Sequence, residues 1–262
     1  EIQKRISNSG KGLWSARALI EKPQIVVDLH REYIEAGARM IITNTYSTIP
    51  SYLAKENLQA EYVRLTRLAG KLARQTVETG SDKVLVAGSI PPLSESYRPD
   101  LVPARDSAMP VYQNMVEALQ PFVDLYICET MSSAVEAEIA ASQAKRWGNG
   151  KPVYVSWTLH EAPGSGLRSG ESLAEAFNKI AYLDVDGYML NCTCPEAIES
   201  GLKHVQGAFI GRRDAGAADH RRRQLNRVDG ALCGHWVQSR SSSLIEVFDR
   251  VRSSTRLTMT AQ

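Results

Sequence analysis

Short apolar runs alternate with amphipathic segments along residues 1–210 of the chain. The apolar runs are rich in β-branched and aromatic residues, and they are nearly continuous rather than alternating. Such runs are typical of strands that are buried on both faces of a parallel sheet. We predict five strands, at residues 40–44, 84–89, 125–128, 153–157 and 187–191, with 207–210 as a candidate for a further one.

The segments between these runs carry apolar residues at helical spacing. Pro23 marks the start of one helix and Gly37 its end, and Pro195 opens the last helix. Ser133 and Glu136 form a capping-box pattern before another helix. The apolar helical faces are formed by Ile25, Leu29 and Tyr33, by Leu65, Leu68 and Leu72, by Met115, Leu119 and Phe122, by Leu173, Phe177 and Ile180, and by Ile198, Leu202 and Val205.

The alternation of strands and helices predicts a parallel sheet with right-handed crossovers. Five strand–helix units within about 170 residues extrapolate to about eight in a complete domain of ~250 residues. We therefore predict an α/β fold of the (β/α)8 barrel type. A doubly wound open sheet is the alternative, but no G-x-G-x-x-G motif follows the first strand.

The composition is that of a globular protein, with 43% hydrophobic and 23% charged residues. No apolar run approaches the ~18 residues that a membrane-spanning helix needs, so we expect no membrane partner. Four cysteines in 262 residues do not suggest a disulfide framework. Free thiols fit a reducing compartment, and we expect a cytoplasmic protein.

The charge pattern changes near residue 210. Residues 211–262 hold ten arginines, no lysine and five acids, whereas residues 1–210 hold 21 Lys plus Arg against 24 acids. We therefore divide the chain into a barrel domain at 1–210 and an atypical Arg- and Ser-rich segment at 211–262, in the place of the last barrel units. The basic segment lacks interleaved aromatic residues and a known binding motif, so we expect no nucleic-acid partner.

Polar residues follow the predicted strands, at the end of a barrel where active sites lie. They comprise one acid, one thiol, one histidine and several neutral hydrogen-bonding groups, which suits a pocket for a small polar molecule. These residues are Thr43, Asn44, Thr45, Gly88, Ser89, Glu129, Thr130, Thr158, His160, Asn191 and Cys192.

Two of these residues each allow more than one interpretation. Glu129 is either an exposed loop acid or a carboxylate that holds a substrate ammonium, and with His160 it would form an acid–base pair. Cys192 is either a small buried apolar residue or a metal ligand. The C-x-C spacing of Cys192 and Cys194 differs from the C-x-x-C spacing of redox pairs.

Four segments together resemble the homocysteine S-methyltransferase family. They are "GLWSARALIEKPQIVVDLHREYIEAGARMIITNTYST" (12–48), "VAGSIPP" (86–92), "CETM" (128–131) and "LNCTCP" (190–195), and the resemblance runs from about Gly12 to Val205. The family is a (β/α)8 barrel that transfers a methyl group from a donor such as S-methylmethionine or betaine to homocysteine, giving methionine.

The resemblance implies roles for individual residues. Cys192 would be the first of three zinc-binding cysteines, and Glu129 would bind the amino group of homocysteine. Four residues match positions that line the family's pocket: Trp14, Asn44, Thr45 and Ser89. Zinc would hold the substrate sulfur as a thiolate, which attacks the methyl carbon of the donor in line.

The sequence departs from the family pattern at both ends. The family begins with a strand whose turn carries a homocysteine-binding acid, and this sequence starts just beyond it. The resulting open edge would allow pairing with another copy, so a homo-oligomer is a further expectation. The family's Gly-Gly-Cys-Cys-Gly pair is absent, and after Ile210 either the sequence diverges or the reading frame changes. Cys233 and His235, with Cys192 and Cys194, are an alternative ligand set.

We therefore expect an enzyme that transfers a methyl group from a sulfonium or ammonium donor, S-methylmethionine in particular, to homocysteine. The expected partners are these two small molecules, and the expected cofactor is zinc. Two alternatives remain open. One is a non-catalytic, metal-free relative that retains a small-molecule pocket, and the other is an unrelated barrel enzyme in which Glu129 and His160 act as acid and base.

Overall fold

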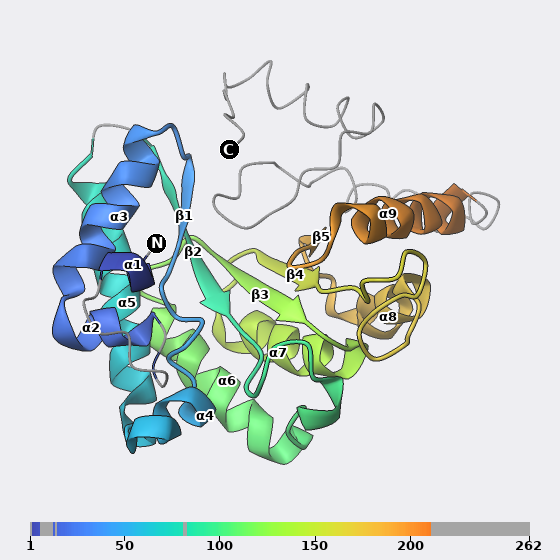
Figure 1. Ribbon diagram of the computed structural model, residues 1–262, viewed down its shortest axis with the longest axis horizontal. Coiled ribbons are helices and arrows are strands. Elements are labelled where there is room, and N and C mark those ends of the chain that lie inside the picture. Colours follow the sequence, from blue (N-terminus) through green and yellow to red (C-terminus); the bar gives the residue numbers. More distant parts are fainter. Residues whose placement is uncertain (1, 6–12, 14, 81–82, 211–262) are drawn as a thin grey trace.

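The computed structural model describes residues 2–5, 13, 15–80 and 83–210. Five strands form a parallel sheet in these residues: β1 (Met40–Ile42), β2 (Leu85–Ile90), β3 (Leu125–Met131), β4 (Val153–Trp157) and β5 (Gly187–Leu190). Each strand pairs with the next one along the chain, in the order β1-β2-β3-β4-β5 (Figure 1). This order never reverses, as in a barrel, whereas a doubly wound sheet reverses at a switch point.

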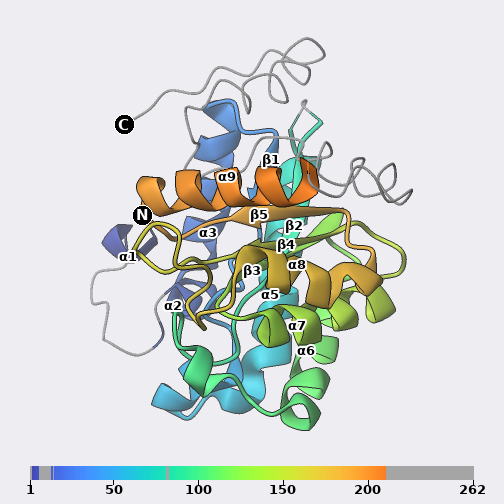
Figure 2. The ribbon, with the colours of Figure 1, turned by 90° about the vertical axis from the view of Figure 1, so that its right-hand side faces the viewer.

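Helices separate the strands along the chain, and successive long helices pack against one another. The long helices are α3 (Pro23–Glu35), α5 (Tyr62–Glu78), α6 (Arg105–Leu119), α7 (Ala134–Trp147), α8 (Leu173–Ile180) and α9 (Pro195–Ile210). Shorter elements are α1 (Ile2–Arg5), α2 (Ala16–Glu21), α4 (Pro50–Leu53) and the 3-10 turns Ala54–Glu56, Gln59–Glu61, Pro99–Leu101 and Ala181–Leu183. Figure 2 shows α9 beside β5, the strand that it follows along the chain.

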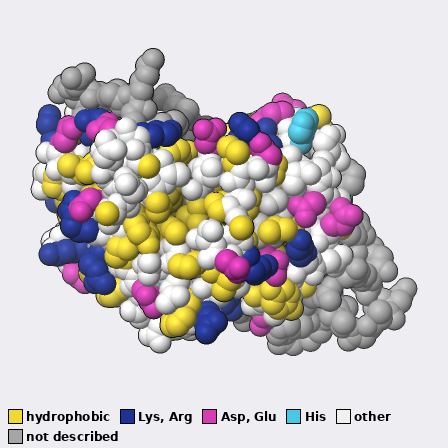
Figure 3. All heavy atoms as spheres, turned by 90° about the horizontal axis from the view of Figure 1, so that it is seen from below, with side chains coloured by type: hydrophobic (Ala, Val, Ile, Leu, Met, Phe, Trp, Pro, Cys, Tyr) yellow, Lys and Arg dark blue, Asp and Glu magenta, His cyan; other side chains and the backbone are white. Residues whose placement is uncertain are grey.

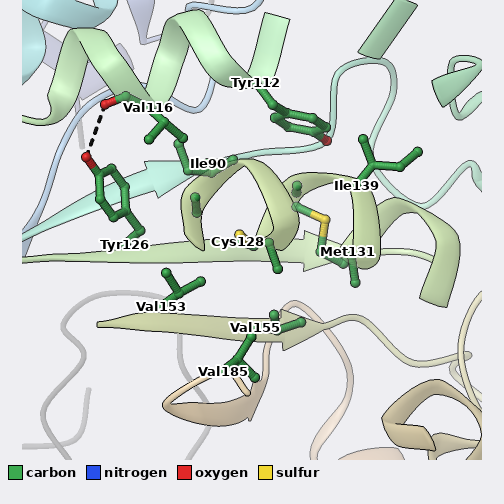
Figure 4. Close-up of a cluster of buried hydrophobic side chains, with 14 of the residues drawn as sticks. Ile90, Tyr112, Val116, Tyr126, Cys128, Met131, Ile139, Val153, Val155 and Val185 are labelled. Atoms are coloured by element: carbon green, nitrogen blue, oxygen red, sulfur yellow. Dashed lines mark hydrogen bonds between the residues drawn. The ribbon is translucent and has the colours of Figure 1, made fainter. Parts of the chain in front are cut away.

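The main hydrophobic core lies between the sheet and the helices that cover its outer face. Tyr126 and Cys128 of β3 and Val155 of β4 project into it, toward α6 and α7 (Figure 4). The Tyr126 hydroxyl donates a hydrogen bond to the backbone oxygen of Val116 at 3.1 Å. Burial raises the pKa of the Cys128 thiol far above its ordinary value, so this cysteine is an apolar packing residue.

Most of the predicted elements are confirmed, with shifts of a few residues at their ends. Strand β3 is longer than expected and continues through Met131, with an irregular register after Cys128. Ser133 caps α7 by accepting a hydrogen bond from the Glu136 backbone at 3.2 Å, but the Glu136 carboxylate accepts from Ser132 rather than from Ser133.

The prediction of a further strand at 207–210 is wrong, because these residues continue α9. A run of four apolar residues fits a strand or a helix turn equally well, and periodicity alone does not separate them. Within the part of the chain that the structure describes, no helix has the length and apolar character that crossing a membrane requires.

Candidate active site

The inner face of the sheet changes from apolar to polar toward the carboxyl ends of its strands. Successive side chains of a strand point to opposite faces, so Ala87 and Ser89 share the inner face, as do Ile127 and Glu129. The apolar members are Ala87, Leu125 and Ile127, with Met40, Ile42, Tyr154 and Met189 packed against them. The polar members are Ser89, Glu129, Ser156 and Asn191. The sheet therefore brings a carboxylate, two hydroxyls and an amide to one edge.

The molecular surface at the carboxyl ends of the strands, toward which β2 runs, is partly apolar. In Figure 3, which views the molecule from below Figure 1, apolar side chains gather over the middle of this face. Tyr97, which follows β2, is one of the large apolar side chains that remain exposed among the described residues. Polar groups set among apolar ones in this way are typical of small-molecule sites, where a few polar contacts fix the orientation of the ligand.

A chain of hydroxyl groups holds the Glu129 carboxylate in place. The Ser89 hydroxyl donates to Glu129 Oε1. Ser89 is itself fixed by its backbone, since its N–H donates to Thr43 Oγ1 at 3.0 Å and its carbonyl accepts from Thr45 Oγ1 at 2.7 Å. The Thr43 and Thr45 hydroxyls also contact each other at 2.9 Å. Thr45 therefore supports Ser89, and its hydroxyl is already occupied within the protein.

The Glu129 carboxylate lacks a positive partner among the described residues. Burial raises its pKa above the ordinary value for glutamate, and the hydrogen bond from Ser89 opposes this rise. Glu129 is half-buried, and withdrawing a carboxylate from water is costly where no ion pair offsets it. The site is therefore suited to a ligand that brings a positive charge to this carboxylate.

The other two predicted pocket residues are placed differently. Asn44 is half-buried after β1, and its Nδ2 donates to the backbone oxygen of Ser15 at 3.0 Å, next to α2. This contact ties the loop after β1 to the start of α2. Trp14 lies outside the described residues.

A second network surrounds the Cys192 sulfur. Asn191 Nδ2 lies 3.3 Å from Cys192 Sγ, and the Thr130 hydroxyl lies 3.8 Å from it. Asn191 Nδ2 also donates to Thr130 Oγ1 at 2.8 Å. Its Oδ1 accepts from the Thr130 backbone at 3.2 Å and from the Ser156 hydroxyl at 2.8 Å. The Asn191 amide thereby links β3, β4 and β5. Its own Nδ2 and the Thr130 hydroxyl are the two donor groups directed toward the sulfur.

Unusual backbone conformations gather at this network. Thr130, Cys192 and Tyr97 have φ values of 59°, 53° and 67°, in the left-handed region that favours glycine. For a β-branched residue such as Thr130 this is a genuine outlier. Backbone strain of this kind costs of order 1–3 kcal/mol per residue and tends to cluster at functional sites. The clustering of all three around one sulfur atom supports a functional role for this region.

Two tyrosines complete the site, and the strand-end pattern did not single them out. The Tyr46 hydroxyl contacts Ser96 Oγ at 2.6 Å, and burial raises the pKa of Tyr46, with further raising by the charges of Glu129 and Cys192. Burial and the hydrogen-bonded Cys192 sulfur together raise the pKa of Tyr97 to about 12. Tyr46 directly follows the polar triplet after β1, which is the signal that could have found it.

The structure does not join His160 to the Glu129 carboxylate. His160 is exposed, and its Nδ1 accepts a hydrogen bond from the Ala162 backbone at 3.1 Å. Its ring is turned into the glycine-containing loop after β4, whereas Glu129 bonds to Ser89. The arrangement gives no support to an acid–base pair of these two residues.

The described residues do not form a complete metal site. No group of three or more His, Cys, Asp or Glu residues that could hold a metal ion is found among them. The sulfur of Cys194 donates to the backbone oxygen of Glu161 at 3.3 Å. Cys233 and His235, the alternative ligands, lie outside the described residues. The geometry therefore fits Cys192 as one ligand at most.

A model of the homocysteine S-methyltransferase family matches residues 1–231. The chain belongs to the homocysteine S-methyltransferase family. The match passes Ile210, so it continues beyond the segments in which we recognised motifs. Membership makes the chain a relative of enzymes.

Several members of the family in bacteria and plants are similar in sequence. Homocysteine S-methyltransferase of Escherichia coli (strain K12) is 28% identical in an alignment of length 228 that covers 80% of this chain and 72% of that protein. Homocysteine S-methyltransferase YbgG of Bacillus subtilis (strain 168) is 25% identical, over 79% of this chain and 70% of that protein. Homocysteine S-methyltransferase 1 of Zea mays is 29% identical, over 71% of this chain and 64% of that protein.

Solved structures confirm the fold class. The metallated form of the homocysteine methyltransferase MmuM from Escherichia coli has a TM-score of 0.70 and 28% identity, over 79% of this chain and 76% of that chain. The oxidized form of the same protein has a TM-score of 0.66 and 25% identity, over 78% of this chain and 74% of that chain. The five described units are thus part of a (β/α)8 barrel, as the sequence pattern predicts.

Proposed function

We propose that this chain transfers a methyl group from a sulfonium donor, S-methylmethionine, to the sulfur of homocysteine. One observation carries the proposal: the half-buried Glu129 carboxylate has no cation beside it in the described part of the chain, and it lies near the same tyrosine, Tyr46, as the Cys192 sulfur. Homocysteine has an ammonium group near one end and a thiol at the other. An ammonium on Glu129 would therefore place its sulfur within the network around Cys192.

The residues of the site then have roles in binding and orienting the substrate. Glu129 accepts the substrate ammonium, and Ser89 fixes the carboxylate through its hydroxyl. The ionised sulfur of homocysteine attacks the methyl carbon of the sulfonium, a new S–C bond forms, and the bond from that carbon to the donor sulfur breaks. The bonding electrons stay on the donor sulfur, so both products are methionine. Holding two reactants in line contributes most of the acceleration in such a transfer.

Zinc is the cofactor that family membership supports, and a relative has been solved in a metallated form. We propose Cys192 as one zinc ligand of this chain, and we assign no step of the reaction to the metal because the described residues do not complete a site. Replacing Cys192 by alanine is expected to remove zinc from the purified protein, whereas Cys194→Ala, the matched control, retains it. Elemental analysis of zinc per chain measures both. Equal zinc in the two variants would exclude Cys192 as a ligand.

Homocysteine binding is expected to weaken as the pH falls through the raised pKa of Glu129. The sign follows from the charge: below that pKa the carboxyl is protonated and no longer attracts an ammonium, and the raised value puts this loss above the range of an ordinary glutamate. Calorimetric titration with homocysteine across acidic and neutral pH measures the effect. Binding that stays constant down to the ordinary glutamate range would contradict the assignment of Glu129.

The location and assembly of the protein remain proposals. The free cysteines Cys128, Cys192 and Cys194 support a reducing, cytoplasmic compartment. A homo-oligomer is an expectation that sedimentation measurements would test.

A further inference from the structure

Three loops meet beside Cys192 around one ion pair. Arg168, after β4, places its guanidinium carbon 4.9 Å from the ring centre of Tyr97, after β2. An Arg168 nitrogen lies 2.5 Å from Glu161 Oε1. Glu161 Oε2 accepts from the Cys194 backbone at 3.2 Å, after β5. The Tyr97 hydroxyl lies near the Cys192 sulfur, which helps to raise the pKa of Tyr97, and this proximity closes a ring of contacts.

Arg168 is held in one orientation within this ring. Its side chain is only 17% exposed, whereas that of Glu161 is 55% exposed. Glu161 pairs with one end of the guanidinium. Hydrogen bonds from Arg168 and Cys194 hold the pKa of the Glu161 carboxyl below its ordinary value. The flat face of the guanidinium is left to stack on the Tyr97 ring. A cation held in this way can fix the position of an aromatic ring.

Tyr97 needs such a support. It has a φ of 67° and is 43% exposed, so neither an easy backbone conformation nor dense packing keeps it in place. The preceding residue, Ser96, is anchored to the Tyr46 hydroxyl at 2.6 Å. The Tyr97 side chain itself contacts Arg168 and lies near Cys192.

We propose that Tyr97 and Arg168 are positioning residues of the methyl-transfer site, in which Arg168 stacks on Tyr97 and the Tyr97 hydroxyl fixes the Cys192 sulfur. The inference rests on the proposed function, because it takes Cys192 to lie where the sulfur of homocysteine reacts. Arg168 touches neither reacting atom and acts through Tyr97. The pair therefore supports the sulfur end of the site, while Glu129 and Ser89 support the ammonium end.

Steady-state kinetics of four variants of the full chain test this pairing. Tyr97→Phe and Arg168→Gln are each expected to lower kcat about tenfold, comparable to the loss of one hydrogen bond at the site. The KM for homocysteine is expected to change less than twofold, because the ammonium end is untouched. The double variant is expected to be no slower than either single one. Arg168→Lys keeps a cation that can pair with Glu161 but lacks the flat face that stacks on Tyr97, so it is expected to recover little of kcat.

Arg98→Gln is the matched control, since Arg98 adjoins Tyr97 but pairs with Asp100 at the surface. It is expected to behave as the wild type. Losses that multiply in the double variant, or full kcat in Arg168→Lys, would overturn the proposal.

A second readout does not depend on activity. The rate of maleimide labelling of Cys192, followed by peptide mass spectrometry, is expected to rise about tenfold in Tyr97→Ala and also in Arg168→Gln, because both uncover the sulfur. Labelling at the wild-type rate in both variants would overturn the positioning role. If the wild type labels as expected but makes no methionine, the proposed function fails while the positioning role stands.

Discussion

Replacing Glu129 by glutamine is expected to weaken homocysteine binding by about 100-fold or more, the effect of breaking a buried ion pair. Glutamine has the same shape and keeps an oxygen that accepts the Ser89 hydroxyl, but it lacks the charge that attracts an ammonium. Calorimetric titration measures the loss. The analogue 4-mercaptobutanoate, which lacks the amino group, is expected to bind the wild type and the variant equally.

The same substitution is expected to raise the free energy of unfolding of the ligand-free protein. The pKa of Glu129 is higher in the folded protein than in an unfolded chain, so its ionisation at neutral pH opposes folding. Removing the charge removes this cost, and thermal unfolding measures the gain. Glu136→Gln is the control for binding, because that buried carboxylate bonds to Ser132 beside α7. Wild-type homocysteine affinity in Glu129→Gln would contradict the site.

Replacing Asn191 by alanine is expected to destabilise the protein by about 2–4 kcal/mol, because several buried groups lose their partners together. Four hydrogen bonds of its side chain are lost, to the Thr130 backbone, the Thr130 and Ser156 hydroxyls, and the Cys192 sulfur. Asn191 is 1% exposed, so water does not replace them. Urea unfolding measures the change.

Two further variants separate the parts of this network. Ser156→Ala removes one partner and is expected to cost about 1 kcal/mol. Asn191→Asp keeps the acceptor oxygen but loses both donor contacts of Nδ2, so it is expected to impair activity even where the protein remains folded. A change below about 1 kcal/mol for Asn191→Ala would show that the amide does not hold the three strands together.

The sequence pattern was sufficient to place the polar residues of the strand ends at one edge of the sheet. Carboxyl ends of parallel strands meet at one edge, so Ser89, Glu129, Asn191 and Cys192 could be grouped before any geometry was known. The pattern does not reveal that the Thr45 hydroxyl bonds within the protein, because a one-dimensional sequence does not show which hydrogen bonds are already made.

Residues in the loops could not be predicted in this way. Tyr97 and Arg168 lie several residues beyond their strands, in segments without periodicity, and they meet only because three loops converge. The left-handed conformations of Thr130 and Cys192 also leave no sequence signal, since both differ from the glycine that such positions favour. The apolar run at 207–210 was misassigned for a related reason, because its helical conformation continues from Pro195.

The central claim is tested most directly by mixing the full chain with S-methylmethionine and with homocysteine whose carbon chain is isotopically labelled. We expect the label to appear in methionine, Glu129→Gln to reduce labelled methionine about 100-fold at low homocysteine, and betaine to be a poorer donor. Absence of labelled product with both donors, from a zinc-loaded protein that still binds homocysteine, would contradict methyl transfer and would favour a non-catalytic relative that retains only the pocket.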